Sequence, residues 1–135
     1  MASNLNVVLT AVAQIIDNTS LTTRATAAFG SATLGAAEAS YINYLPIAAG
    51  GTALSLPAAT IWVLVVHSLA GINSAPNGNI TVNVTPAGGV AAVAGLVLPN
   101  GFWIYYQVAE TAGGLTACTL TASVNLTPVE LLMAA

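Results

Sequence analysis

The chain has 135 residues, the length of one ordinary domain, and it is long enough to bury a sizeable core. Charged residues make up only 4% of it, against about 25% in a typical soluble domain. There is no lysine, and the ionic side chains are Asp17, Arg24, Glu38, Glu110 and Glu130. One cation can neither neutralise nucleic-acid phosphates nor attract an anionic membrane surface, so the sequence argues against both partners.

The first segment carries an apolar stripe. Leu5, Val8, Val12 and Ile15 recur at the spacing of one helical face, and they also fit a heptad a/d pattern. We therefore predict an N-terminal helix or extended arm. Its stripe either packs on its own domain or forms an interface between copies of the chain.

Residues 18–40 are mostly small and polar, which is typical of an arm or loop, with a short strand expected around Thr26–Phe29. This change of composition predicts that the chain has two parts. Residues 1–40 are the helix or arm, used for assembly or anchoring, and residues 41–135 are a β-sandwich domain.

From Tyr41 onward the pattern is that of β-strands. Ile80, Val82 and Val84 alternate with polar residues, as in a half-buried strand, and a second alternation runs from Leu120 to Thr127. Strands are expected near 41–47, 52–56, 60–67, 79–85, 90–97, 102–109, 115–126 (one strand or two) and 128–133. This spacing predicts an all-β fold, an antiparallel sandwich of jelly-roll-like type.

Glycine pairs at 50–51, 88–89 and 113–114 separate these strands and predict turns. Asn77-Gly78 and Asn100-Gly101 are the strongest short hairpin signals in the chain.

Residues 53–72 are long enough to cross a bilayer, so a membrane helix has to be considered. Pro57 and His67 interrupt the segment, no basic residue flanks it, and its continuous apolar run, Ile61–Val66, has the length of a strand. A buried strand is the favoured interpretation. The N-terminus lacks the positive region of a signal peptide.

The titratable residues are few and scattered, so we predict no catalytic residue, no cofactor and no metal site, and a protein that is not an enzyme. His67 is interpreted as a hydrogen-bonded residue at a strand end, and Cys118 as a small buried hydrophobe. Glu130 is expected either to face outward from the last strand or to pair with Arg24 across a subunit boundary.

A surface of Thr, Ser, Asn, Gly and Ala costs little to desolvate, because few ions have to lose water when two copies meet. The composition therefore favours assembly into a larger structure. The predicted interface residues are Leu5, Val8, Val12, Ile15, Arg24 and Glu130. Trp62, Trp103, Tyr105 and Tyr106 are expected to divide between core and contacts, with both tryptophans in the core.

The apolar N-terminal segment, the Thr/Ala/Gly arm and the motifs TPAGGV, LPNGFWIYY and VNLTPVELLMA together resemble small structural proteins of tailed-bacteriophage virions. The resemblance is to capsid decoration (cement) and head-fibre proteins. It implies a non-enzymatic protein on the outer surface of the particle, a homo-oligomer with a trimer favoured, bound to the major capsid protein or another virion protein.

Two alternatives remain open. One is a phage tail or fibre component. The other is a secreted filament subunit or extracellular binding module, whose exposed loops, such as Ala70–Asn79, would contact a ligand.

Overall fold

The computed structural model describes residues 5–16, 19–36, 39–56, 60–106 and 113–135. These residues contain ten strands and a single 3-10 turn, η1 (Ile72–Ser74), with no α-helix among them. The strands are β1 (Leu5–Ile16), β2 (Thr23–Ala36), β3 (Ala39–Ile47), β4 (Thr52–Ala53), β5 (Val63–Ser68), β6 (Ile80–Pro86), β7 (Val93–Val97), β8 (Phe102–Tyr106), β9 (Leu115–Ala122) and β10 (Thr127–Ala134).

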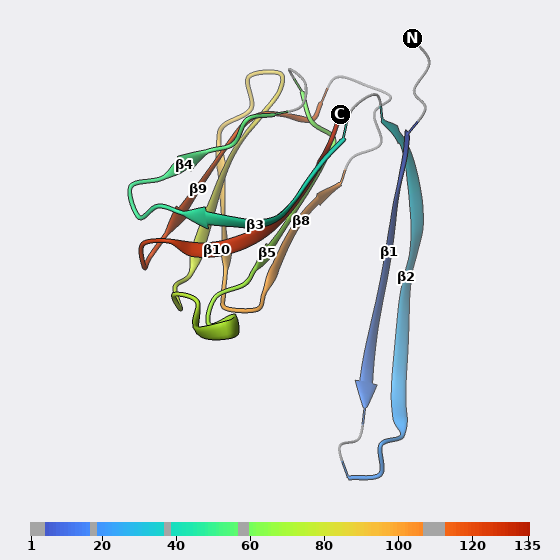
Figure 1. The fold of residues 1–135 in the computed structure, drawn as a ribbon. Coiled ribbons are helices and arrows are strands. Elements are labelled where there is room, and N and C mark those ends of the chain that lie inside the picture. The colour runs from blue at the N-terminus through green and yellow to red at the C-terminus, as the bar shows by residue number, and fades with distance from the viewer. Residues whose placement is uncertain (1–4, 17–18, 37–38, 57–59, 107–112) are drawn as a thin grey trace.

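Strands β3 to β10 form a jelly roll. Strand β3 pairs with β10, β4 with β9, β5 with β8 and β6 with β7, so the eight strands are nested like one long folded hairpin. Rolling this hairpin adds the β10–β5 and β9–β6 pairs and gives two four-stranded antiparallel sheets, β3-β10-β5-β8 and β4-β9-β6-β7. The predicted antiparallel sandwich of jelly-roll type is confirmed (Figure 1).

The core lies between the two sheets and takes every second residue of their strands. From β6 come Ile80, Val82 and Val84, while Leu120 comes from β9 and Leu131 from β10, all at most 3% exposed. Trp103 and Tyr105 pack against this core from β8. The alternation seen in the sequence is therefore the alternation between core and outside.

The second alternation, from Leu120 to Thr127, does not continue as one strand. Strand β9 ends at Ala122, and the chain turns before β10 begins at Thr127. Val124 and Leu126 are exposed, whereas Thr127 is buried and donates its hydroxyl to the Val124 carbonyl. The structure thus has two strands here, with a tight turn between the sheets.

The turn signals identify turns but not which strands pair. Gly88 and Gly89, with φ of 79° and 73°, connect β6 to its hydrogen-bonded neighbour β7. Asn100-Gly101 instead lies between β7 and β8, and Asn77-Gly78 between β5 and β6, which belong to opposite sheets. The hairpin interpretation of both Asn-Gly pairs is therefore wrong.

The N-terminal segment is an arm and not a helix. Strands β1 and β2 form an antiparallel hairpin whose register runs from Leu5 opposite Ala36 to Ile16 opposite Thr23. The sequence also has a period of two, since residues 5, 7, 9, 11, 13 and 15 are all apolar. A lone helix of this length is only marginally stable in water. Strand β2 pairs with β1 along the whole length of β1, and this pairing explains why the segment is a strand.

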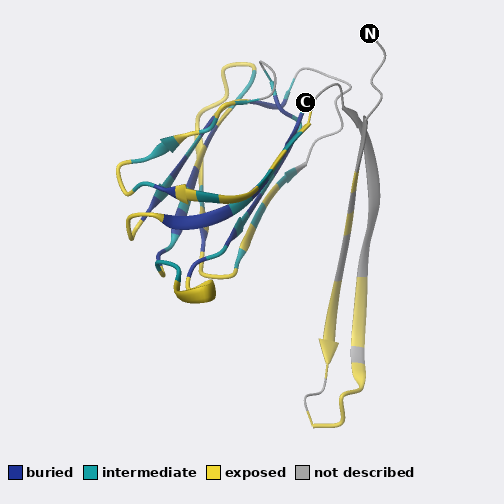
Figure 2. Ribbon diagram, in the orientation of Figure 1, coloured by how far each residue is buried: buried dark blue, intermediate teal, exposed yellow. Residues whose placement is uncertain are grey.

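Within the described residues, the arm forms a two-stranded sheet of its own that pairs with neither sheet of the sandwich. It projects beside the sandwich, and its described side chains are exposed (Figures 1 and 2). A two-stranded hairpin standing alone is at best marginally stable in water.

Candidate assembly surface

The two outer faces of the jelly roll differ in chemistry. On the β4-β9-β6-β7 sheet, the outward residues Thr81, Asn83 and Thr85 of β6 lie opposite Thr121, Thr119 and Ala117 of β9. These two central strands thus present mainly small polar side chains, as expected on a sheet that faces water, and the edge strand β7 adds the exposed Leu96 opposite Thr81.

The outer face of the β3-β10-β5-β8 sheet is apolar instead. The register aligns Tyr41, Leu132, Val65 and Ile104 in one row across all four strands. Phe102 lies in the adjacent row. Tyr41, Phe102 and Ile104 are 59%, 61% and 47% exposed. We call these five residues the assembly surface.

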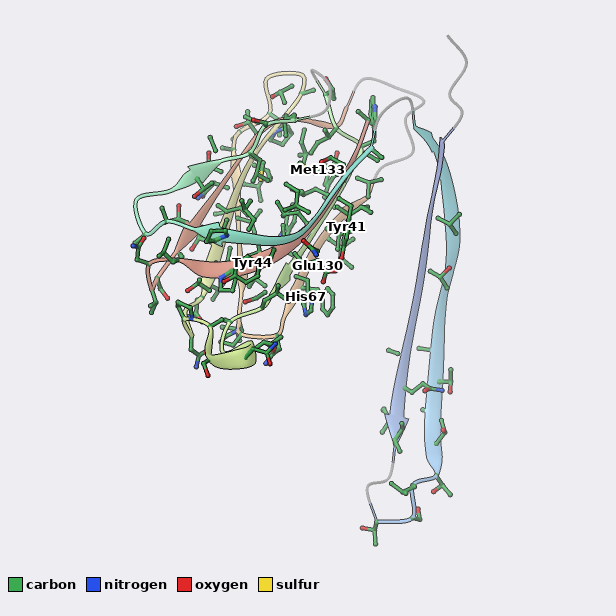
Figure 3. The ribbon with its side chains drawn as sticks, viewed as in Figure 1. Tyr41, Tyr44, His67, Glu130 and Met133 are labelled. Carbon is green, nitrogen blue, oxygen red and sulfur yellow. The ribbon has the colours of Figure 1, made fainter. Side chains whose placement is uncertain are left out.

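A hydrogen-bonded polar group borders the assembly surface. The His67 Nδ1 atom lies 2.9 Å from Glu130 Oε2, and the Tyr41 hydroxyl donates to Glu130 Oε1. The His67 ring stacks on Phe102, with 4.1 Å between ring centroids and 4° between planes. These groups come from four different strands, and Figure 3 shows Tyr41, Glu130 and His67 gathered on one side of the sandwich.

The hydrogen bonds shift the ionisation of this group. The bond from His67, and after it the bond from Tyr41, lower the pKa of Glu130, because both stabilise the carboxylate. The bond to Glu130 raises the pKa of Tyr41, because it favours the protonated phenol as donor. Glu130 is therefore an ion at neutral pH, with both its oxygens hydrogen-bonded.

A shallow depression of about 190 Å³ lies among these side chains. Tyr41, His67, Phe102 and Glu130 line it together with Val65, Leu131 and Leu132. These lining residues include no serine or cysteine that could act as a nucleophile beside the His67–Glu130 pair. The mixture of aromatic and aliphatic walls with one ionic edge is suited to receiving a side chain of another protein molecule.

Two of the six predicted interface residues have described side chains on the arm. Val8 and Ile15 are 60% and 66% exposed in the single chain, and their place in an interface stays a prediction. They lie on one strand at an odd spacing, so they point to opposite sides and do not form a single stripe. The helical stripe is therefore wrong. The side chains of Leu5, Val12 and Arg24 lie outside the described residues.

Glu130 faces outward from the last strand, as predicted, and its side chain is 34% exposed. Its proposed pairing with Arg24 of another copy stays a prediction. The five assembly-surface residues were not predicted as a group. The alternation of Phe102 and Ile104 with inward-facing Trp103 and Tyr105 is the signal that could have identified the two exposed positions on β8.

The other residues considered for chemistry occupy ordinary positions. His67 is hydrogen-bonded near the end of β5, and Cys118 is buried, which raises its pKa to about 12. Trp62 packs with Val65 and Leu132 on a small second cluster around Val63 and Ala134. The Tyr106 side chain lies outside the described residues.

Within the described part of the chain, no three His, Cys, Asp or Glu residues gather as a metal site, and no helix is long and apolar enough to cross a membrane. Part of the 53–72 segment forms strand β5. No protein-family model matches the chain, and no curated protein or solved structure is significantly similar to it.

Proposed function

We propose that this chain is a non-enzymatic structural protein of a bacteriophage virion, which assembles with copies of itself, as a trimer, and decorates the capsid shell. The observation that carries the proposal is the contrast between the two outer faces of the sandwich. The outer face of the β4-β9-β6-β7 sheet presents threonine and asparagine on its two central strands and Leu96 on its edge strand, whereas the outer face of the other sheet presents Tyr41, Phe102 and Ile104.

Covering the assembly surface with a neighbouring subunit is favourable because its area is apolar and its one ion is already hydrogen-bonded. Each apolar Å² removed from water contributes about 25 cal/mol. Glu130 keeps its bonds to His67 and Tyr41 when the face is covered, so its burial leaves no unpaired carboxylate oxygen. The net charge of −3 also gives little repulsion between copies.

The arm supplies a second contact that reaches beyond the sandwich. A strand of 12 residues spans about 40 Å, enough to reach across a neighbouring domain. Its exposed Val8, Ile15 and Ile16 are apolar, and contact with a neighbour would stabilise a hairpin that has no third strand. The jelly roll also occurs in proteins with other functions, so the virion setting depends on the resemblance and not on the fold.

Light scattering on the purified full chain tests the assembly. We expect a particle of three times the 13.4 kDa chain mass. A mass of one chain at every accessible concentration would contradict the proposal.

A charge exchange tests the predicted pairing of Arg24 with Glu130 of a neighbouring copy. Arg24→Glu and Glu130→Arg should each weaken the oligomer, and the double variant should regain part of the loss because the opposite charges again meet. Equal weakening in the double and single variants would exclude this pair while leaving assembly itself intact.

The virion setting is tested separately on intact particles from the source of the sequence. An antibody against the full chain should label their outer surface, and the chain should be found in their purified protein. If the chain is found instead in secreted filaments, the filament alternative replaces the virion one.

A further inference from the structure

A second concave site, which shares no residue with the assembly surface, lies at the end of the sandwich that carries η1. It has a volume of about 350 Å³, within the range of small-ligand pockets. Strand β3 contributes Tyr44, β10 contributes Pro128, and the segment after β5 contributes the other lining residues, Leu69, Ile72, Asn73, Ser74, Ala75 and Pro76.

A β-bulge places Tyr44 at this site. Leu45 pairs with Val129 and Ile42 with Leu131, so two residues of β3, Asn43 and Tyr44, lie opposite the single residue between them on β10. Regular alternation after the inward Ile42 would turn Tyr44 into the core. The bulge instead leaves Tyr44 55% exposed, where it lines the cavity. Bulges are common where a sheet redirects a side chain toward a functional site.

The opposite wall is held in an unusual backbone conformation. Asn73 has φ of 49° and ψ of 43°, and Ser74 has φ of 65°, both in the left-handed region that non-glycine residues seldom adopt. Backbone bonds from Ile72 to Leu69 and from Ala75 to Ile72 close the loop in this shape. Among the described residues, the side-chain amide of Asn73 and the hydroxyl of Ser74 have no hydrogen-bond partner. Strained residues of this kind cluster at ligand-binding sites.

The lining chemistry restricts the ligand. None of the lining residues is acidic or basic, so a phosphate, a carboxylate or an ammonium group would find no ionic partner among them. They offer an exposed aromatic ring, an amide, a hydroxyl and two prolines. A sugar ring matches this set, because its C–H groups are attracted to the negative face of an aromatic ring and its hydroxyls bond to amide and hydroxyl groups.

We propose that the cavity between Tyr44 and the Asn73-Ser74 turn binds a neutral saccharide, of monosaccharide or disaccharide size. Tyr44 stacks on the sugar ring, while Asn73 and Ser74 bind its hydroxyls. The site does not depend on the proposed virion role, and none of its lining residues belongs to the assembly surface.

Titration of the isotope-labelled full chain with D-glucose, D-galactose, N-acetyl-D-glucosamine, lactose and maltose tests the proposal. At least one of these sugars should shift the amide signals of residues 69–75 and leave those of β6 and β7 unchanged. Glucuronic acid is the anionic comparison, and it should bind more weakly than the neutral sugars. No localised shift with any neutral sugar, or preferred binding of the acid, would overturn the proposal.

Variants then test whether the Tyr44 ring and the Asn73 side-chain amide contribute to sugar binding, independently of the stability of the fold. Tyr44→Ala should weaken binding about tenfold, whereas Tyr44→Phe should retain the stacking and most of the affinity. Asn73→Gly keeps a residue suited to the left-handed conformation but removes the amide, and it should weaken binding roughly threefold. Leu96→Ala, on the outer face of the other sheet, is the control, and unfolding curves verify that every variant folds. Unchanged affinity in both Tyr44→Ala and Asn73→Gly would place the sugar elsewhere and contradict the assignment.

Discussion

Replacing Phe102 by serine should weaken assembly without unfolding the subunit. Phe102 lies on β8, an edge strand, and is 61% exposed in the single chain. Full burial of a phenylalanine contributes about 1.5–3 kcal/mol, so covering this exposed part in the oligomer contributes roughly 1–2 kcal/mol at each subunit interface. The association constant should therefore fall roughly five- to thirtyfold for each interface from which the ring is removed.

The sandwich provides a matched control for this change. Leu96 is 62% exposed and faces outward from β7, which is the edge strand of the other sheet. Leu96→Ser removes a similar exposed fraction from an equivalent position, but on the polar face. It should leave the association constant unchanged if only the apolar face is covered by neighbours.

Sedimentation velocity over a dilution series measures both association constants, and urea unfolding checks that each variant remains folded. The stacking of Phe102 on His67 predicts a loss of stability of about 1 kcal/mol in the folded subunit, which the unfolding curve would reveal. Equal effects of the two substitutions, or wild-type association in Phe102→Ser, would refute the assignment of this face as the interface.

Three further outcomes are expected of the folded subunit. A methyl group at Gly95 would overlap the Trp103 indole, so Gly95→Ala should destabilise the fold by about 1–3 kcal/mol in urea unfolding, whereas Gly50→Ala, in open space, should change it little. Cys118, with its pKa raised to about 12 by burial, should react with a thiol reagent at pH 8 only as fast as the protein unfolds, and rapid labelling of the folded chain would contradict its burial. Glu130 has a folded pKa below its unfolded value, so its contribution to stability is present above the unfolded pKa and is lost as pH falls through the folded pKa. The stability difference between wild type and Glu130→Gln should shrink on acidification, and a difference that grows would show that the carboxylate is not the stabilising form.

The N-terminal segment shows how far sequence periodicity can lead. The helical stripe at Leu5, Val8, Val12 and Ile15 and the alternation at every second residue from Leu5 coexist in the same stretch, so periodicity alone could not choose between them. Strand β2, with its register from Thr23 to Ala36, favours a hairpin, because it satisfies the backbone hydrogen bonds of β1. That pairing depends on a segment that the sequence describes only as small and polar.

In the candidate sites too, some positions follow from local sequence and others depend on contacts between distant segments. The outward position of Glu130 on the last strand is predictable from its neighbours, and the structure places it there. Tyr41 and His67 could not be connected with it, since 89 and 63 residues separate them from Glu130 along the chain. The outward position of Tyr44 has no signal in the sequence, because only the β-bulge of β3 against β10 turns this side chain out of the core.

Local patterns in the chain are enough to establish the all-β character of the sandwich domain, the approximate place of its eight strands and the near absence of charge. They are enough because the direction of each side chain along a strand and the backbone conformation of a turn depend mainly on residues that are close in sequence. Which strands become neighbours, and with that the alignment of Tyr41, Leu132, Val65 and Ile104 in one row, emerges from the folded molecule alone. Strand order follows from hydrogen bonding between distant segments and from burial of one shared core, and no short stretch of chain contains that information.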